Sequence, residues 1–74
     1  MTTIRYEPAE EFLLTPEQAR RIRVLSGYGK KSLAVKMGVT PQTVWRWETG
    51  RSPLIGDNAY KLATIAMQNG VQYE

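Results

Sequence analysis

Residues 30–53 read KKSLAVKMGVTPQTVWRWETGRSP, and this stretch decides the fold. Its apolar residues recur at the spacing that two short helices need to pack across a sharp turn: Leu33, Met37, Val39, Val44 and Trp47. Gly38 stands where that turn needs a positive φ, which a residue with a Cβ adopts only at a cost. The stretch therefore predicts a helix over about 30–37, a tight turn, and a helix over about 40–48.

One further helix is predicted on each side of this pair. On the N-terminal side, Thr15 is a suitable cap for a helix that Gly27 ends, and a glutamine three residues after Thr15 completes a capping box. On the C-terminal side, an apolar stripe at helical spacing predicts a helix over about 57–69, with Asp57 as its cap. The chain is thus expected to be all-α, with four helices.

The two ends of the chain carry weaker signals. Residues 1–14 combine β-prone residues with a proline and three acidic side chains, so they predict either an arm or an edge strand. Residues 71–74 are too few for another stable element. We therefore expect one helical domain over residues 15–70, between an N-terminal arm or strand and a C-terminal tail.

Composition excludes several classes of function. The 74 residues include no cysteine and no histidine, which excludes a disulfide framework, a zinc finger and an imidazole general base. A chain this short has one core, and its longest aliphatic-aromatic run, residues 12–14, is far too short to cross a membrane. We expect a cytoplasmic protein that is not an enzyme, binds no metal or cofactor, and does not contact a membrane.

The positive charge is concentrated in the middle of the chain. The formal net charge of the whole chain is +3. Residues 16–53 contain eight basic and two acidic residues, a net charge of +6, whereas residues 1–15 carry −2 and residues 54–74 carry −1. A basic stretch of this size indicates a polyanionic partner, either nucleic acid or an acidic protein.

The motif in the middle of the chain resembles the Cro/cI (Xre-type) helix-turn-helix family. The resemblance covers roughly residues 15–68, and the matching segments are Lys30-Lys31-Ser32-Leu33-Ala34, Gly38-Val39-Thr40, Val44, Trp47-Glu48-Thr49-Gly50 and Pro53. It implies a compact lambda-repressor-like domain of four helices, or five if the last helix of the family is present. It also implies transcriptional regulation through a third helix that enters the DNA major groove, usually in a dimer.

A helical wheel of the third helix separates an outward face from an inward one. At about 100° per residue, Gln42, Trp45, Arg46 and Thr49 fall on one side, with Thr43 beside them. Glutamine can bond adenine and arginine can bond guanine through two hydrogen bonds each. In the context of the motif, Gln42, Arg46 and Trp45 are therefore the expected base-reading residues.

Trp45 has more than one possible role. An outward tryptophan could press on thymine methyl groups or deoxyribose, or it could cover an apolar edge of the arm or of a partner. It could also fold back against Ile55 or Pro53. The sequence does not choose between these placements.

Phosphate contacts are expected around the two helices of the motif. Lys30 and Lys31 stand at the start of the second helix, where backbone N–H groups and positive side chains would meet a phosphate. Thr43, Thr49 and Arg51 match the positions where the resemblance implies contact with the DNA backbone.

The resemblance also implies an ion pair between Arg23 and Glu48. Relatives often pair an arginine of the first helix with the glutamate of the motif, and Arg23 stands at the matching position. Glu48 neighbours the inward-facing Trp47, so its charge needs a partner. We interpret the pair as structural: it joins the first helix to the third and reads no base.

Two departures from the family pattern bear on function. Pro41 occupies the first position of the third helix, where relatives often present a polar base reader. The fifth helix of the family is truncated or absent, and relatives often dimerise through their C-terminal helices. The surface through which this chain would form a dimer is therefore not evident from the sequence.

The sequence as a whole predicts a regulator that binds specific sites in double-stranded DNA. We expect a transcriptional repressor that acts as a homodimer, because one recognition helix reads too few base pairs for useful specificity. The alternative is a protein-interaction module, for example an antitoxin that neutralises a toxin through its arm and also binds DNA.

Overall fold

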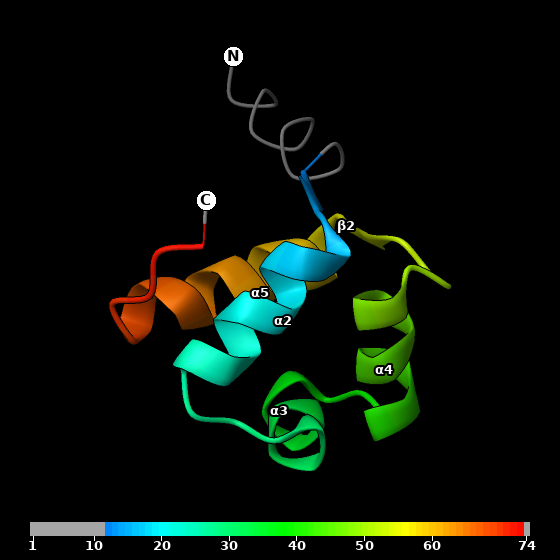
Figure 1. The fold of residues 1–74 in the computed structure, drawn as a ribbon, viewed down its shortest axis with the longest axis horizontal. Coiled ribbons are helices and arrows are strands. Elements are labelled where there is room, and N and C mark those ends of the chain that lie inside the picture. Colours follow the sequence, from blue (N-terminus) through cyan, green and yellow to red (C-terminus); the bar gives the residue numbers. More distant parts are fainter. Residues whose placement is uncertain (1–11, 74) are drawn as a thin grey trace.

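The structure, a computed structural model, describes residues 12–73. This part of the chain contains four helices and one pair of two-residue strands (Figure 1). Along the chain these elements are β1 (Leu13–Leu14), α2 (Pro16–Leu25), α3 (Lys30–Met37), α4 (Pro41–Thr49), β2 (Leu54–Ile55) and α5 (Asp57–Gln68). The predicted all-α fold with four helices is confirmed. Residues 13–14, which lie in the stretch predicted as either an arm or an edge strand, form β1, whereas β2 and its pairing with β1 were not predicted.

Side-chain caps and left-handed glycines fix the helix ends. The Thr15 hydroxyl accepts a hydrogen bond from the Gln18 backbone N–H at 3.0 Å, and the Gln18 side chain accepts one from the Thr15 N–H at 3.0 Å. This is the predicted capping box at the start of α2. Gly38 follows α3 with a φ of 74°, so the predicted tight turn is confirmed. The expected cap at Asp57 is wrong: Gly56 is the cap, and Asp57 is the first residue of α5.

The helices enclose a core of side chains from every element. The largest of its fully buried side chains are Ile22, Leu33, Met37, Val44, Leu54 and Leu62. Trp47 is also buried, as predicted, and presents the inward side of α4 to this core. Because α4 contributes both Val44 and Trp47, one side of the helix is fixed and the other side is left for solvent.

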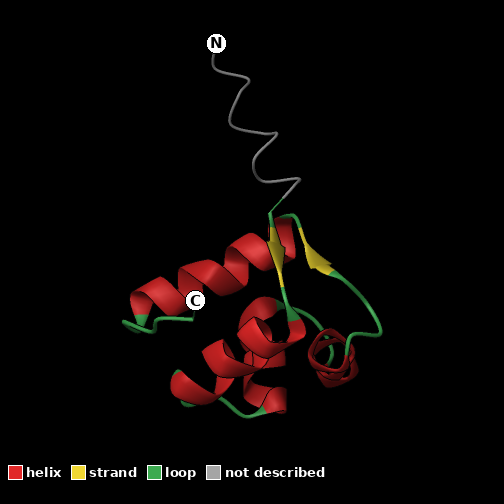
Figure 2. Cartoon of the chain, turned by 45° about the horizontal axis from the view of Figure 1, so that its top comes forward, coloured by secondary structure: helices red, strands yellow, loops and turns green. Residues whose placement is uncertain are grey.

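The strands β1 and β2 pair antiparallel beside the N-terminal end of α5 (Figure 2). Leu13 lies opposite Ile55, and Leu14 lies opposite Leu54. Leu14 and Leu54 are buried in the core, whereas Leu13 and Ile55 are exposed. Residues 13–14 thus form a strand, while residues 1–11 of the predicted arm or strand lie outside the described residues.

No further helix follows α5 within the described chain, and Val71 and Tyr73 pack partly buried against the core. None of the helices in residues 12–73 is long and apolar enough to cross a membrane.

Candidate nucleic-acid interface

The outward side of α4 carries the four side chains that the helical wheel placed there. Gln42, Trp45, Arg46 and Thr49 are all exposed, and Thr43 beside them is half-buried. Gln42 and Arg46 are four residues apart, so they lie on the same face of the helix, one turn from each other. The result is a short polar and basic face on a helix whose opposite side is anchored in the core.

Local hydrogen bonds and a left-handed glycine fix both ends of α4. Before the helix, the Val39 N–H donates to the Ala34 carbonyl at 2.9 Å, which reverses the chain at Gly38, and the Thr40 hydroxyl caps α4 by accepting from the Thr43 N–H at 3.2 Å. After the helix, Gly50 adopts a φ of 79°. These constraints leave α3 and α4 packed against each other with a tight turn between them (Figure 1).

A partly buried ion pair joins α4 to α2. The Arg23 Nε donates to the Glu48 Oε2 at 2.6 Å, and the Arg23 Nη2 donates to the Glu48 Oε1 at 3.1 Å. The Arg23 Nη1 also donates to the Tyr28 carbonyl, at 3.2 Å, in the segment between α2 and α3. The two side chains are only 11% and 5% exposed. This two-bond geometry fixes the orientation of both groups, so Arg23 links α2, the connecting segment and α4.

Arg51 lies over the ring of Trp45. The guanidinium carbon is 4.9 Å from the ring centroid, within the range of a cation–π interaction. The contact arises because Gly50 turns the chain back, and the Arg51 N–H donates to the Arg46 carbonyl at 2.9 Å. Trp45 is 38% exposed. The sequence reasoning treated Trp45 and Arg51 separately; the glycine five residues after Trp45 was the signal that could have joined them.

The threonine hydroxyls around α4 are already hydrogen-bonded within the protein. The Thr49 hydroxyl donates to the Trp45 carbonyl at 2.9 Å. The Thr43 and Thr40 hydroxyl oxygens are 2.9 Å apart. A hydroxyl has a single hydrogen to donate, so a phosphate contact by Thr49 requires its hydroxyl to leave the helix carbonyl. Thr40 was not among the expected contacts, although its place at the start of α4 makes it a neighbour of Thr43.

Lys30 and Lys31 form the first turn of α3 and are both exposed. Gly29 is the cap and has no side chain to occupy the helix start; instead the Ser32 hydroxyl accepts from the Gly29 N–H at 2.9 Å. The backbone N–H groups of this turn and the two ammonium groups therefore share one end of the helix, which is a favourable arrangement for an anion.

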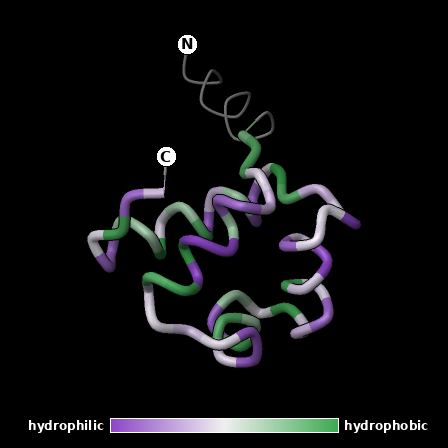
Figure 3. The backbone as a smooth tube through the Cα atoms, in the orientation of Figure 1, coloured by the Kyte–Doolittle hydropathy of each residue, from purple (hydrophilic) through white to green (hydrophobic). Residues whose placement is uncertain are grey.

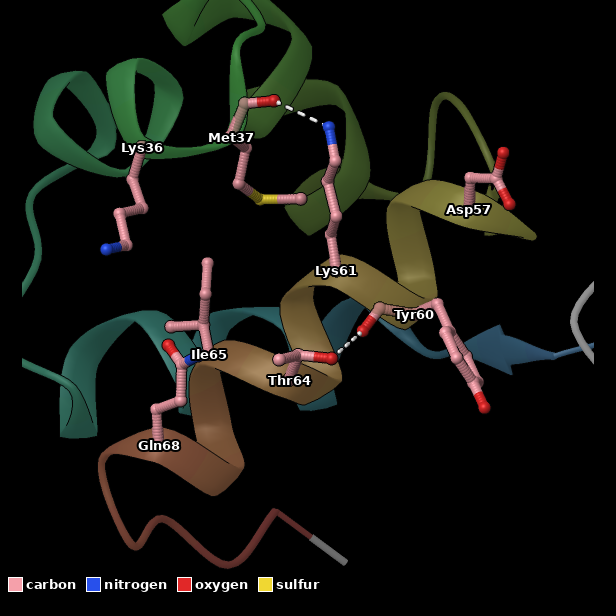
Figure 4. A pocket seen from close by; sticks show the side chains of 8 residues that line it. All are labelled: Lys36, Met37, Asp57, Tyr60, Lys61, Thr64, Ile65 and Gln68. Carbon is pink, nitrogen blue, oxygen red and sulfur yellow. Dashed lines mark hydrogen bonds between the residues drawn. The ribbon is translucent and has the colours of Figure 1, made fainter.

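A separate groove of about 560 Å³ lies between α3 and α5 (Figure 4). Lys61 reaches across it and donates to the Met37 carbonyl at 3.4 Å, near the negative end of the α3 dipole. None of the residues expected to contact DNA lines this groove. Within residues 12–73, no three side chains of the metal-ligating types come together to hold an ion.

An exposed polar and basic helix, set across a tight turn from a second short helix with lysines at its start, defines a DNA-binding domain of the helix-turn-helix class. The helix-turn-helix family model matches residues 20–65. The chain belongs to the Xre/lambda-repressor-type helix-turn-helix family, whose members are DNA-binding regulators. No curated protein and no solved structure matches the chain.

Proposed function

We propose that the protein is a transcriptional repressor that recognises specific sites in duplex DNA by placing α4 in the major groove. The observation that carries this proposal is the division of α4 into two sides. Trp47 is buried and Glu48 is held by Arg23, while Gln42 and Arg46 are exposed one turn apart. A helix fixed on one side and polar on the other can present base-reading groups in a constant orientation.

Each exposed residue of α4 has a role suited to its chemistry. Gln42 would bond adenine and Arg46 would bond guanine, each by two hydrogen bonds at the major-groove edge. Trp45 would contact thymine methyl groups or deoxyribose beside them. Backbone phosphates would be held by the flanking basic and hydroxyl side chains: Lys30, Lys31, Thr43, Thr49 and Arg51.

The stacking of Arg51 on Trp45 supports the proposal that Arg51 holds a phosphate. A side chain that is already ordered loses less conformational entropy when it binds than a freely moving one. The guanidinium lies over the ring at 4.9 Å from its centroid, so Trp45 would assist phosphate binding as well as contact the groove.

The expected active form is a homodimer on a two-fold symmetric operator. One helix of nine residues contacts only a few base pairs, and a second copy doubles the site that is read. The half-sites would then lie about one helical turn, or a multiple of it, apart.

Titration of a fluorescent random duplex at two salt concentrations tests the DNA-binding part of the proposal. Binding at low salt that weakens steeply as salt is raised is expected, because basic side chains displace counterions from DNA. Absence of salt-sensitive binding would contradict it. Selection of bound sites from random DNA then tests specificity: a palindromic consensus is expected, and an unselective pool would show that α4 reads no sequence.

Replacement of Arg46 by alanine is expected to weaken binding to the selected operator by about 1–3 kcal/mol and to relax the preference at one base position. The reason is the loss of two hydrogen bonds to one base. Competition between operator variants measures both effects. An equal loss on every DNA sequence would show that Arg46 holds a phosphate instead.

Replacement of Lys30 by alanine is expected to weaken binding to all sequences alike. It should also reduce the slope of log affinity against log salt concentration by about 1, as expected for the loss of one phosphate contact. Arg20→Ala is the matched control, because Arg20 is exposed on α2, outside the expected interface. An unchanged slope for Lys30→Ala would reject the phosphate contact.

A second candidate function is a protein-interaction module such as an antitoxin. The acidic stretch at residues 1–11, with three glutamates and one arginine, favours it, because these charges are repelled by DNA. Absence of salt-sensitive binding in the random-duplex titration would favour a module that acts only on another protein, whereas an antitoxin that also binds DNA would show such binding.

A further inference from the structure

The outer face of the strand pair is apolar and exposed. Leu13 and Ile55 are directly opposite each other across the two strands, and they are 56% and 46% exposed. Directly opposed side chains of an antiparallel pair lie close enough to touch. Pro53, which precedes β2, is exposed as well. We call Leu13, Pro53 and Ile55 the sheet face. The hydrophobic segments of β1 and β2 lie side by side where the coloured tube starts after the N-terminal grey trace (Figure 3).

A hollow of about 200 Å³ adjoins the sheet face. It is bounded by Leu13 and Pro53 of the sheet face, by Leu54 of β2 and by Trp47 of α4. An apolar cavity of about 150 Å³ can hold a benzene molecule, so this hollow is large enough to receive an aliphatic side chain. The surface thus offers protruding aliphatic side chains and a recess for one.

The chain segments that form the sheet face carry no charge. Residues 12–16 and residues 52–56 contain no acidic and no basic side chain. The expected phosphate contacts, in contrast, are basic or hydroxyl groups on α3, α4 and the loop after α4. The sheet face therefore offers no basic side chain to bind DNA phosphates, and its partner is expected to present an uncharged, apolar surface.

We infer that the sheet face is where two copies of this chain associate about a two-fold axis, with Ile55 of each copy seated in the hollow of the other. A two-fold interface uses the same patch on both copies, so the patch must complement itself. Protruding aliphatic groups beside an apolar recess, without charge, meet that condition. The occupant follows from the proposed function, on which this inference rests: a two-fold operator requires a second copy.

The position of the sheet face favours a second copy of the chain over an unrelated apolar protein as its partner. Trp47 belongs to α4 and also bounds the hollow. β2 begins at Leu54, soon after α4 ends at Thr49. A contact at the hollow would therefore fix the second copy directly against the recognition helix. The spacing between the two α4 helices would then be set with no flexible segment in between, as reading of paired half-sites requires.

Sedimentation equilibrium of the full chain tests the inference. The unchanged protein is expected to form a dimer. Ile55→Lys is expected to raise the dissociation constant of the dimer about tenfold or more, because a charge would be buried in an apolar recess without a partner. The matched control is Val35→Lys on α3, where an 81% exposed aliphatic side chain is replaced outside the sheet face; it should leave the dimer unchanged.

Three outcomes would overturn the inference: a monomeric parent protein, an Ile55→Lys variant that dimerises as tightly as the parent, or equal weakening by Val35→Lys. Circular dichroism during heating shows that each variant is folded, and Leu13→Lys provides a second variant if Ile55→Lys does not fold. Random-duplex binding is measured in parallel. A dimer that binds no DNA would defeat the proposed function and leave the interface standing, whereas a DNA-binding monomer would defeat the interface alone.

Discussion

Glu48→Ala is expected to lower the free energy of unfolding by about 3–5 kcal/mol, the range for removal of one partner from a buried ion pair. The loss is large because Arg23, only 11% exposed in the ion pair, would lose the carboxylate that compensates its charge. Small domains are stable by only about 5–15 kcal/mol, so the variant should be close to unfolding at 25 °C. Urea unfolding followed by tryptophan fluorescence measures the change.

Two variants serve as controls for Glu48→Ala. Glu17→Ala removes an exposed glutamate from the first turn of α2 and should change stability by less than about 1 kcal/mol. The double replacement Arg23→Met with Glu48→Leu should recover much of the loss, because it removes both charges instead of leaving one buried. A loss below about 1 kcal/mol for Glu48→Ala would show that solvent screens the pair like a surface ion pair.

Leu54→Ala is expected to lower the free energy of unfolding by about 2–5 kcal/mol, as leucine truncations in a core do. Leu54 is 2% exposed and lies opposite Leu14, which is also buried. Truncation would leave a cavity under the strand pair, because both strands are held by backbone bonds such as that from the Gly56 N–H to the Phe12 carbonyl at 2.9 Å. The urea midpoint should fall by a corresponding amount.

Ile55→Ala is the matched control for Leu54→Ala, since Ile55 is the next residue of the same strand but faces outward. Its effect on unfolding of the monomer should lie within about 0.5 kcal/mol. Comparable losses from both substitutions would show that β2 does not have one buried and one exposed side.

The helices could be predicted because residues close to each helix end determine where that helix begins or stops. Thr15, Thr40, Gly38 and Gly50 act through hydrogen bonds or dihedral angles within a few residues of themselves, so the sequence alone defines them. The strand β2 and its pairing with β1 could not be predicted, because two-residue strands have no periodicity and their pairing joins segments about forty residues apart in the chain. The sequence predicts Asp57 as the cap for a related reason: the φ of 70° at Gly56 depends on how β2 leads into α5, and no local signal marks it.

In the candidate site, too, the features set by local geometry could be predicted, and those set by the path of the chain in three dimensions could not. The exposed face of α4 follows from helix geometry, which is why a wheel placed Gln42 and Arg46 outward, as the structure has them. The stacking of Arg51 on Trp45 depends on how Gly50 redirects the chain after α4 ends. That direction is a property of the turn in three dimensions and not of the residue spacing.

The three-way contact of Arg23 has a consequence for how this domain can diverge. Arg23 holds Glu48 and the Tyr28 carbonyl, so the pose of α4 is set from its inward side. Exposed positions such as Gln42 and Arg46 make no contribution to that anchorage. Under the proposed function, separate side chains of one nine-residue helix therefore govern operator preference and folding stability. Exchange of the outward residues can then change the binding specificity with little loss of stability.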